Sequence, residues 1–381
     1  MSIKIDFIDL KAQQALIRPE IDAAIKKVLD HGQYIMGPEV TELEDRLASF
    51  CGVKHTISCA NGTDALGLVL FAKCIGPGDA VFVPSFTFAA TAEVVAWVGA
   101  TPVFIDSLPN TFNIDPESLR QGIKTAKELG LRPKGIIPVD LFGQAADYDA
   151  IQPIADEHNL WIMADAAQSF GGKYKGKSIG SLGEVATTSF FPAKPLGGYG
   201  DGGAIFTNND ELADTLKCLR IHGQGADKYD NIRIGINGRL DTLQAAILLE
   251  KLNIFPEEIK KRQEVAHRYS DALKEVANPP FVLENTLSAW AQYTLVLPEA
   301  IDRSVLMENL KKKGIPTVVY YVKPLHLQGA YKNYPVAGQK SLPVCEALAN
   351  HVLSLPMHPY LSEDAQSYIT KELIAEIKKQ A

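Results

Sequence analysis

Lys194 and Asp165 are the residues whose types and positions most directly suggest chemistry. Lys194 follows an apolar segment and precedes five glycines between positions 197 and 203. A lysine held in such a loop and desolvated beneath a ligand could have its pKa lowered enough to form an imine. Asp165 ends a short apolar segment, and active-site groups of open α/β sheets project from the C-terminal ends of strands. Taken singly, however, most lysines are solvated surface groups, and an aspartate in this position could simply cap a helix.

The segment Ser58–Ala65 is a candidate anion site. It is expected to end a strand in a glycine turn and to open a helix. Backbone N–H groups at Gly62, Thr63 and Asp64 would be unpaired in the first helical turn, and together with the positive end of the helix dipole they favour a phosphate. An ordinary helix cap is the alternative interpretation of the same residues.

A second polar loop contains Asn237 and Arg239, ahead of a predicted helix. Either side chain could reach a phosphate or a carboxylate; the alternatives are a helix cap for Asn237 and a salt bridge for Arg239. Gly198–Gly203 also satisfies the dinucleotide pattern G-x-G-x-x-G, but the strand predicted at Ala204–Thr207 follows it where a helix is required. The dinucleotide interpretation therefore fails on its context.

Short β-branched or aromatic segments alternate with amphipathic segments from about residue 55 to residue 210. Each junction carries Gly, Pro, Asn or Asp, which is typical of a wound βαβ sheet. Because the strand segments are nearly continuously apolar, we expect them to be covered on both faces. The predicted strands are His55–Ser58, Ala80–Pro84, Pro102–Asp106, Gly135–Asp140, Leu160–Ala164, Val185–Ser189 and Ala204–Thr207, with helices between them, for example at Asp64–Ala72 and Thr91–Gly99.

The chain on either side of this region is mostly helical in its periodicity. A second unit is predicted to begin near Asn278, and its pattern suits a small α+β domain. The predicted helices are Pro19–Asp30, Glu39–Phe50, Asn209–Arg220, Leu240–Leu252, Glu257–Val276 and Arg303–Lys313, and the predicted strands of the second unit are Gln292–Leu297 and Gly314–Val319. We therefore predict two domains: residues 1–255, with the N-terminal segment and the large α/β domain, and residues 256–381, with a linking helix and a small C-terminal α+β domain.

The composition excludes several classes of protein. The 381 residues are 46% hydrophobic and 22% charged, as in an average soluble globular protein. Thirty-eight Lys and Arg against 45 Asp and Glu give a net charge of −7, so no nucleic-acid partner is expected. No stretch of ~18 apolar residues and no apolar signal-peptide core occur, which predicts a cytoplasmic location without a membrane span. The five cysteines and eight histidines lack metal-binding spacing, so no metal is predicted.

Seven segments in order resemble the DegT/DnrJ/EryC1/StrS family of pyridoxal-phosphate sugar aminotransferases: NGTDA, PSFTFAATAE, IPVDLFGQAADYDAI, ADAAQSFGG, TSFFPAKPLGGYGDGG, GINGRLDTLQAAILLEKL and GIPTVVYYVKPLHLQ. The resemblance runs from Ile5 to about Tyr360. It implies an α/β fold of type I, like that of aspartate aminotransferase, with a large domain built on a mostly parallel sheet and a smaller C-terminal α+β domain. It also implies pyridoxal 5′-phosphate as the cofactor and a homodimer whose active sites are shared between subunits.

The resemblance implies a role for each candidate residue. Lys194 corresponds to the lysine that binds pyridoxal phosphate covalently and then moves the substrate proton. Asp165 corresponds to the acid paired with the pyridine nitrogen, and Gln168 to the amide beside the ring oxygen. The remaining cofactor positions correspond to phosphate ligands at Gly62, Thr63 and Ser189, a ring-stacking aromatic at Phe88, and a residue that reaches the phosphate from the neighbouring subunit at Asn237. Some family members are dehydratases with histidine in place of the lysine, whereas this chain has the lysine.

The substrate that the resemblance implies is a nucleotide-linked keto sugar, with L-glutamate as amino donor and 2-oxoglutarate as its product. Within the family, the chain most resembles the branch that aminates UDP-2-acetamido-2-deoxy-3-oxo-glucuronate in bacterial polysaccharide (O-antigen) synthesis. This resemblance rests on the segments HGQYIMGPEVTELEDRL, SCANGTDAL, FGGKYKGK, GRLDTLQAAILLEKL and LPMHPYL. Arg239 would then bind the sugar carboxylate or lie in the dimer interface, and Tyr320 and Tyr321 would lie near the sugar. The family often has His where this chain has Asp140.

Three alternatives remain open at this level. The first is an aminotransferase for a 3- or 4-keto-6-deoxy sugar nucleotide. The second is decarboxylation or β-elimination on the same scaffold, because the reaction depends on which Cα bond lies perpendicular to the cofactor ring. The third is a regulatory DNA-binding protein, against which the acidic charge balance argues.

Overall fold

The large sheet of the protein has seven strands in the order β1-β9-β8-β5-β4-β2-β3. The computed structural model describes residues 4–227 and 229–380. The strands of this sheet are β1 (His55–Cys59), β2 (Asp79–Pro84), β3 (Thr101–Ile105), β4 (Arg132–Ile136), β5 (Trp161–Asp165), β8 (Val185–Ser189) and β9 (Gly203–Thr207). β9 runs antiparallel to both of its neighbours, and the other neighbouring strands pair in parallel. The C-terminal ends of six strands therefore meet at one edge of the sheet.

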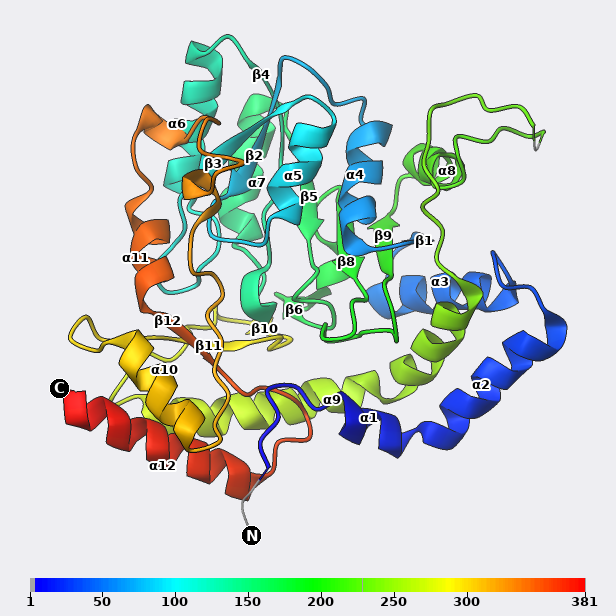
Figure 1. Ribbon diagram of the computed structural model, residues 1–381. Helices are drawn as coiled ribbons and strands as arrows, with labels where there is room; N and C mark the ends of the chain where they lie inside the picture. Colours follow the sequence, from blue (N-terminus) through cyan, green and yellow to red (C-terminus); the bar gives the residue numbers. More distant parts are fainter. Residues whose placement is uncertain (1–3, 228, 381) are drawn as a thin grey trace.

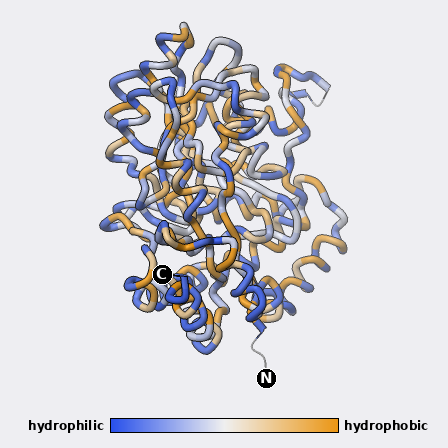
Figure 2. Tube along the Cα trace, turned by 60° about the vertical axis from the view of Figure 1, so that its left-hand side comes forward, coloured by the Kyte–Doolittle hydropathy of each residue, from blue (hydrophilic) through white to orange (hydrophobic). Residues whose placement is uncertain are grey.

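Helices surround the large sheet in the upper part of Figure 1, and the N-terminal helices extend below it. The strands are nearly continuously apolar, as expected for strands that helices cover on both faces. Hydrophobic segments accordingly run through the middle of the body in Figure 2, and the outer helices alternate between hydrophobic and hydrophilic residues. The helices are α1 (Leu10–Leu16), α2 (Arg18–His31), α3 (Pro38–Cys51), α4 (Gly62–Ala72), α5 (Ala90–Trp97), α6 (Pro116–Glu128), α7 (Tyr148–His158) and α8 (Asp210–Leu219).

A second hydrophobic cluster lies beneath the sheet, built on two antiparallel strands. These strands and the C-terminal helices are β11 (Tyr293–Val296), β12 (Val352–Leu355), α10 (Arg303–Lys312), α11 (Pro343–His351) and α12 (Glu363–Gln380), and the short strands β6 (Lys173–Tyr174), β7 (Lys177–Ser178) and β10 (Thr286–Leu287) form a third sheet. Helix α9 (Thr242–Leu273) runs below the sheet in Figure 1 and contributes buried residues to both clusters. The domain boundary at residue 255 stays a prediction, because it falls inside this shared helix.

The structure corrects three predicted elements. The helices predicted at Leu240–Leu252 and Glu257–Val276 are one continuous helix, α9, with Pro256 inside it. Proline removes one helical hydrogen bond, but burial of α9 against both clusters outweighs that loss. The strand predicted at Gly135–Asp140 ends at Ile136, ahead of Pro138, which has no N–H for a ladder. The described residues 314–319 form no strand where Gly314–Val319 was predicted; Val318 makes only an isolated bridge to Ser354.

Two histidines are buried in this fold, and their burial lowers the pKa of each below the ordinary value of 6.5. His358 is the more extreme case: it is 4% exposed, and burial is the largest cause of its lowered pKa. Asp9 opposes the lowering of its pKa, and Arg262 adds to it. The folded protein therefore holds His358 neutral at a pH where the unfolded chain would protonate it.

We predict that His358→Leu weakens the acid sensitivity of folding. As pH falls below 6.5, the unfolded state binds a proton at this position that the folded state does not, so the free energy of unfolding decreases. Urea unfolding of wild type and variant at pH 5.5 and pH 7.5 checks this. The loss between the two pH values should be smaller in the variant, and the control His267→Gln, at a largely exposed side chain, should behave as wild type. Equal losses in wild type and His358→Leu would contradict the prediction.

Candidate active site

A cavity of about 890 Å³ lies at the C-terminal edge of the large sheet. Residues at or just after the ends of four strands line the cavity. Gly62 and Thr63 follow β1, and Phe88 follows β2. Asp165 ends β5, and Ser189 ends β8, with Lys194 five residues later. Tyr320, Tyr321 and Gln328 close the cavity from the C-terminal part of the chain. Most of the residues predicted from separate segments of the sequence thus line one space.

Asp165 is the buried acid of this cavity, with 5% exposure. Its carboxylate accepts hydrogen bonds from Thr91 Oγ1 at 2.9 Å and from Ala167 N at 3.2 Å. Burial raises the pKa of Asp165, while these hydrogen bonds and the positive charge of Lys194 act in the opposite direction. A cation placed against this carboxylate would favour its ionised form further.

Lys194 shares the cavity with Asp165. Burial lowers the pKa of its amine, and the charge of Asp165 partly opposes this. In the part of the chain that the structure describes, the amine makes no hydrogen bond or ion pair, so its only electrostatic partner is the field of Asp165. A half-buried amine with a lowered pKa is what a lysine needs in order to act as a nucleophile or base near neutral pH.

The loop that carries Lys194 is held tightly. Lys194 N donates to Phe191 O at 2.8 Å, and a Cβ on Gly197 would lie 2.4 Å from Pro192 O, so only glycine fits there. Helix α9 fixes the far side of the loop: Lys251 Nζ donates to Gly197 O, and Gln244 Oε1 accepts from Tyr199 N at 2.8 Å. The glycines that follow Lys194 therefore serve close packing, and the backbone around the lysine is constrained.

The start of helix α4 forms an anion cradle opposite Ser189. Asn61 caps the helix by accepting from Asp64 N at 2.7 Å, so the Asp64 N–H that the sequence predicted to be unpaired is already bound. The N–H groups of Gly62 and Thr63 belong to the first turn and have no partner within the helix. A Cβ on Gly62 would lie 2.7 Å from Ser189 Cβ, so the absence of a side chain lets the helix end approach Ser189.

Gln168 and Tyr321 form a hydrogen-bonded pair at the cavity wall. Gln168 Nε2 donates to Tyr321 Oη at 3.1 Å, and Gln168 Oε1 accepts from Phe142 N at 2.8 Å. Asp140 lies behind this wall, fully buried, and burial raises its pKa to about 7. It accepts from Ala146 N, Tyr148 Oη and Ser169 Oγ at 2.8, 3.0 and 3.1 Å, which makes it a structural acceptor away from the cavity lining.

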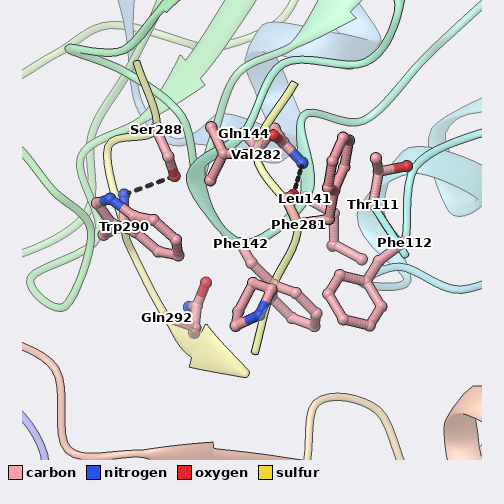
Figure 3. Close-up of a pocket in the computed structure, with 11 residues that line it drawn as sticks. Thr111, Phe112, Leu141, Phe142, Gln144, Phe281, Val282, Ser288, Trp290 and Gln292 are labelled. Carbon is pink, nitrogen blue, oxygen red and sulfur yellow. Dashed lines mark hydrogen bonds between the residues drawn. The ribbon is translucent and has the colours of Figure 1, made fainter. Parts of the chain in front are cut away.

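The turn that donates to Gln168 is itself fixed by a packed layer next to the cavity. Figure 3 shows this layer around a much smaller hollow of about 10 Å³, with Phe112 and Phe142 side by side. The two rings pack edge to face at 5.2 Å. Gln144 Nε2 donates to Phe281 O at 2.9 Å and its Oε1 accepts from Leu283 N at 2.8 Å, so the turn is tied to the C-terminal part of the chain.

Phe88 and Phe191 are apolar side chains left open in the cavity, with exposures of 59% and 51%. Exposed aromatic rings beside a buried acid and a lysine are suited to stacking on a flat ligand. The sequence missed Thr91, whose hydroxyl binds Asp165, and Gln292, which lines the cavity. Tertiary packing places both residues at the site, and no local sequence pattern predicts their position there.

Asn237 and Arg239 do not line the cavity. Asn237 is exposed, and its backbone forms an isolated bridge with Ile221. Arg239 is half-buried, and its Nε lies buried without a hydrogen-bond partner in the described chain. The structure of one chain thus unites all the predicted site residues except this pair. Residues 4–227 and 229–380 also contain no cluster of His, Cys, Asp and Glu that could hold a metal, and no helix there is long and apolar enough to cross a membrane.

Comparison with known proteins gives matches along almost the whole chain. The profile of the DegT/DnrJ/EryC1/StrS aminotransferase family matches residues 15–374. A UDP-2-acetamido-2-deoxy-3-oxo-D-glucuronate aminotransferase from Pseudomonas aeruginosa is 55% identical over 359 residues, which cover 94% of this chain and 96% of the relative. A DegT DnrJ EryC1 StrS aminotransferase from Brucella abortus has a crystal structure that superposes with a TM-score of 0.95 at 55% identity, over 97% of this chain and 99% of that one.

A third match concerns the cofactor. The crystal structure of NtdA from Bacillus subtilis, with bound cofactor PMP, superposes with a TM-score of 0.90 at 30% identity, over 99% of this chain and 86% of that one. The predicted α/β fold of type I is confirmed, and the regulatory alternative is not favoured. With a matching profile, relatives above half identity and a shared fold, the chain belongs to the DegT/DnrJ/EryC1/StrS aminotransferase family, and it is an enzyme of the transaminase class.

Proposed function

We propose that this enzyme uses pyridoxal 5′-phosphate to transfer an amino group from L-glutamate to a nucleotide-linked keto sugar, UDP-2-acetamido-2-deoxy-3-oxo-D-glucuronate. The observation that carries the proposal is the placement of Lys194, Asp165 and the α4 anion cradle around one cavity. The substrate follows from the name of the Pseudomonas aeruginosa relative and from the substrate branch that the sequence resembles. The same proposal includes a cytoplasmic location and a role in O-antigen synthesis.

The residues present fit this cofactor at each of its parts. The first turn of α4 and Ser189 would hold the phosphate, because Gly62 leaves the helix end open against Ser189. The buried Asp165 would receive the protonated ring nitrogen, which supplies the hydrogen-bonded cation that this carboxylate lacks. The exposed ring of Phe88 would stack on the cofactor, and Gln168 would donate to the ring oxygen.

The chemistry divides between the cofactor and the side chains. When bound, pyridoxal phosphate supplies an electron-withdrawing ring that stabilises negative charge on the substrate carbon that loses its proton. Lys194 would hold the cofactor and, once the incoming amine had displaced it, would take that proton on Nζ as a base and return it as an acid. The lowered pKa of Lys194 favours this exchange near neutral pH. Asp165, ionised, would hold the proton on the ring nitrogen.

The charges of the cavity indicate that one chain does not make the whole substrate site. Four acids line it in the described chain, Asp64, Glu93, Asp165 and Asp201, against the single cation Lys194. A nucleotide-linked uronate and the cofactor phosphate are all anionic, so further cations are required. We propose that a second subunit supplies Asn237 for the phosphate and Arg239 for the sugar carboxylate in a homodimer with shared sites. Tyr320 and Tyr321 would contact the sugar.

Gly62→Ala is expected to weaken cofactor binding. The new Cβ would lie 2.7 Å from Ser189 Cβ, so helix α4 must move away and lose a hydrogen bond to the phosphate. One charge-assisted hydrogen bond contributes about 1.5–3 kcal/mol, so the affinity should fall roughly 10- to 150-fold. Titration of cofactor-free protein with pyridoxal phosphate measures this. Gly67→Ala, in the same helix with 3.9 Å to its nearest neighbour, is the control and should bind as wild type. Wild-type affinity of Gly62→Ala would remove the α4 cradle from the proposal.

The substrate is tested with a panel of nucleotide-linked amino sugars in the reverse direction. Purified enzyme is incubated with 2-oxoglutarate and each sugar, and glutamate is measured. The UDP-linked 3-amino uronic acid should react, and neutral 3- or 4-amino-6-deoxy sugars should react poorly. Turnover of the neutral 4-amino sugars alone would contradict both the substrate and the role of Arg239. Carbon dioxide release or elimination products in place of 2-oxoglutarate, with glutamate as donor, would contradict transamination itself.

A further inference from the structure

We propose that His326 is a positioning residue, which acts through Ser85 to fix the segment Tyr320–Gln328 so that Tyr320 and Tyr321 form the sugar-facing wall of the cavity. The assignment of a sugar to this wall rests on the proposed function; the fixing of the segment does not. Ser85 and His326 belong to the family-like segments PSFTFAATAE and PLHLQ of the sequence, and the chemistry described above uses neither of them.

The contact between Ser85 and His326 is buried and contains several hydrogen bonds. Ser85 Oγ lies 2.7 Å from His326 Nδ1, and the same oxygen accepts from His326 N at 3.1 Å. Leu325 N donates to Ser85 O at 2.9 Å. Ser85 is fully buried and His326 is 7% exposed. Three hydrogen bonds thus join the residue after β2 to two consecutive residues of the C-terminal segment.

The hydrogen-bond pattern assigns the proton on the histidine. Glu346 Oε1, on helix α11, lies 3.3 Å from Nε2 and is an acceptor, so Nε2 carries the hydrogen of the neutral ring. Nδ1 is then unprotonated and accepts the hydroxyl hydrogen of Ser85, whose oxygen also accepts from His326 N. Burial favours the neutral ring by lowering the pKa of His326, while Glu346 and Asp106 oppose that shift. The neutral Nε2–H tautomer satisfies all of these contacts.

The segment fixed in this way carries part of the cavity wall. Tyr321 Oη accepts from Gln168 Nε2 at 3.1 Å, and the Tyr321 ring packs edge to face on Phe86 at 6.1 Å, next to Ser85 in sequence. Gln328, two residues after His326, lines the cavity and donates to Lys323 O at 3.0 Å. On the other side of the tyrosines, Val318 pairs with Ser354 through backbone hydrogen bonds of 2.8 and 3.2 Å. His326 is therefore the C-terminal anchor of the wall.

Ser85, His326 and Glu346 have the residue types of a hydrolytic triad, but the geometry excludes that role. Neither Ser85 nor His326 lines the cavity, and Ser85 Oγ is fully buried between backbone and ring. A nucleophile needs space for a reacting carbon beside it. The three residues are arranged to hold two parts of the chain together.

Substitution of His326 by Asn or by Gln tests the contacts of its two ring nitrogens separately. His326→Asn places a polar group at the Nδ1 position and keeps the contact with Ser85, whereas His326→Gln reaches the Nε2 position and keeps only the contact with Glu346. In hydrogen exchange of the holoenzyme, we expect faster exchange of residues 319–324 in His326→Gln than in His326→Asn and wild type. Ser85→Ala should behave like His326→Gln. Equal exchange in the two histidine variants, or wild-type exchange in Ser85→Ala, would overturn the anchor.

Kinetics then test the link to the sugar. Since a displacement of about 1 Å in a positioning group can cost ~100-fold, KM for the keto sugar should rise roughly 10- to 100-fold in His326→Gln. The half-reaction with glutamate, followed through the absorbance of the bound cofactor, should stay within about threefold of wild type in both variants. An unchanged KM in His326→Gln, or an equal loss in both half-reactions, would contradict the sugar-facing role. If wild type fails to aminate the sugar, the proposed function fails, while the exchange result still decides the anchor.

Discussion

Lys194→Ala is expected to lose transamination almost completely and to lose the visible absorbance of protein-linked pyridoxal phosphate. In the proposed mechanism the amine of Lys194, which lines the cavity and has a lowered pKa, forms the covalent bond to the cofactor and moves the substrate proton. Removal of general acid–base catalysis alone lowers kcat by about 10²- to 10⁴-fold. Glutamate consumption and the absorbance spectrum of the purified variant provide the measurement.

The control for this variant is Lys177→Ala, at an exposed lysine of the short strand β7. It should retain both the spectrum and the rate. A thermal unfolding curve of Lys194→Ala close to that of wild type shows that the fold is intact. If Lys194→Ala keeps the visible band, Lys194 has no place in the mechanism.

Asp165→Asn is expected to have the second largest effect. Asparagine preserves the volume and can still accept from Thr91 Oγ1, but it removes the charge that would hold the proton on the ring nitrogen. The lost charge-assisted hydrogen bond corresponds to about 1.5–3 kcal/mol, or roughly a 10- to 150-fold loss of cofactor affinity. We expect a further loss in kcat, because the uncharged ring is a weaker electron sink.

Thr91 provides the matched control for Asp165. Thr91→Ser keeps the hydroxyl that donates to the carboxylate at 2.9 Å, and it should behave as wild type. Thr91→Val removes that hydrogen bond but keeps the charge, so its cofactor affinity should fall between wild type and Asp165→Asn. Equilibrium dialysis of the cofactor measures all three affinities, and wild-type binding by Asp165→Asn would exclude the ion pair.

The large domain and its two central residues could be predicted from the sequence, because their signals are local. Strands buried on both faces are continuously apolar, so six of the seven predicted strands fall within one or two residues of their observed bounds. Asp165 could be located because it ends such a strand, at the edge of a parallel sheet where strand ends converge. The role expected for Lys194 comes from the resemblance of the segment TSFFPAKPLGGYGDGG to the family, because a single lysine before a glycine-rich loop is not distinguished from a solvated surface lysine.

The remaining features depend on contacts between distant segments. Pro256 predicts a helix boundary, yet α9 continues through it because two hydrophobic clusters bury the helix on both sides of the proline. Thr91 lies in an apolar helix, and its hydrogen bond to Asp165 is recognised only from the folded structure, which brings the two residues together. Arg239 lies outside the cavity of its own chain, and the proposed role at the substrate therefore assigns it to the site of a second subunit.

The most direct test of this account is borohydride reduction of the holoenzyme followed by peptide mapping. Reduction makes the bond between the cofactor and its lysine permanent, and mass spectrometry then identifies the modified residue. The account predicts the added mass on one peptide only, the one that contains Lys194. Attachment at a different lysine, or none in enzyme that still binds the cofactor, would contradict it.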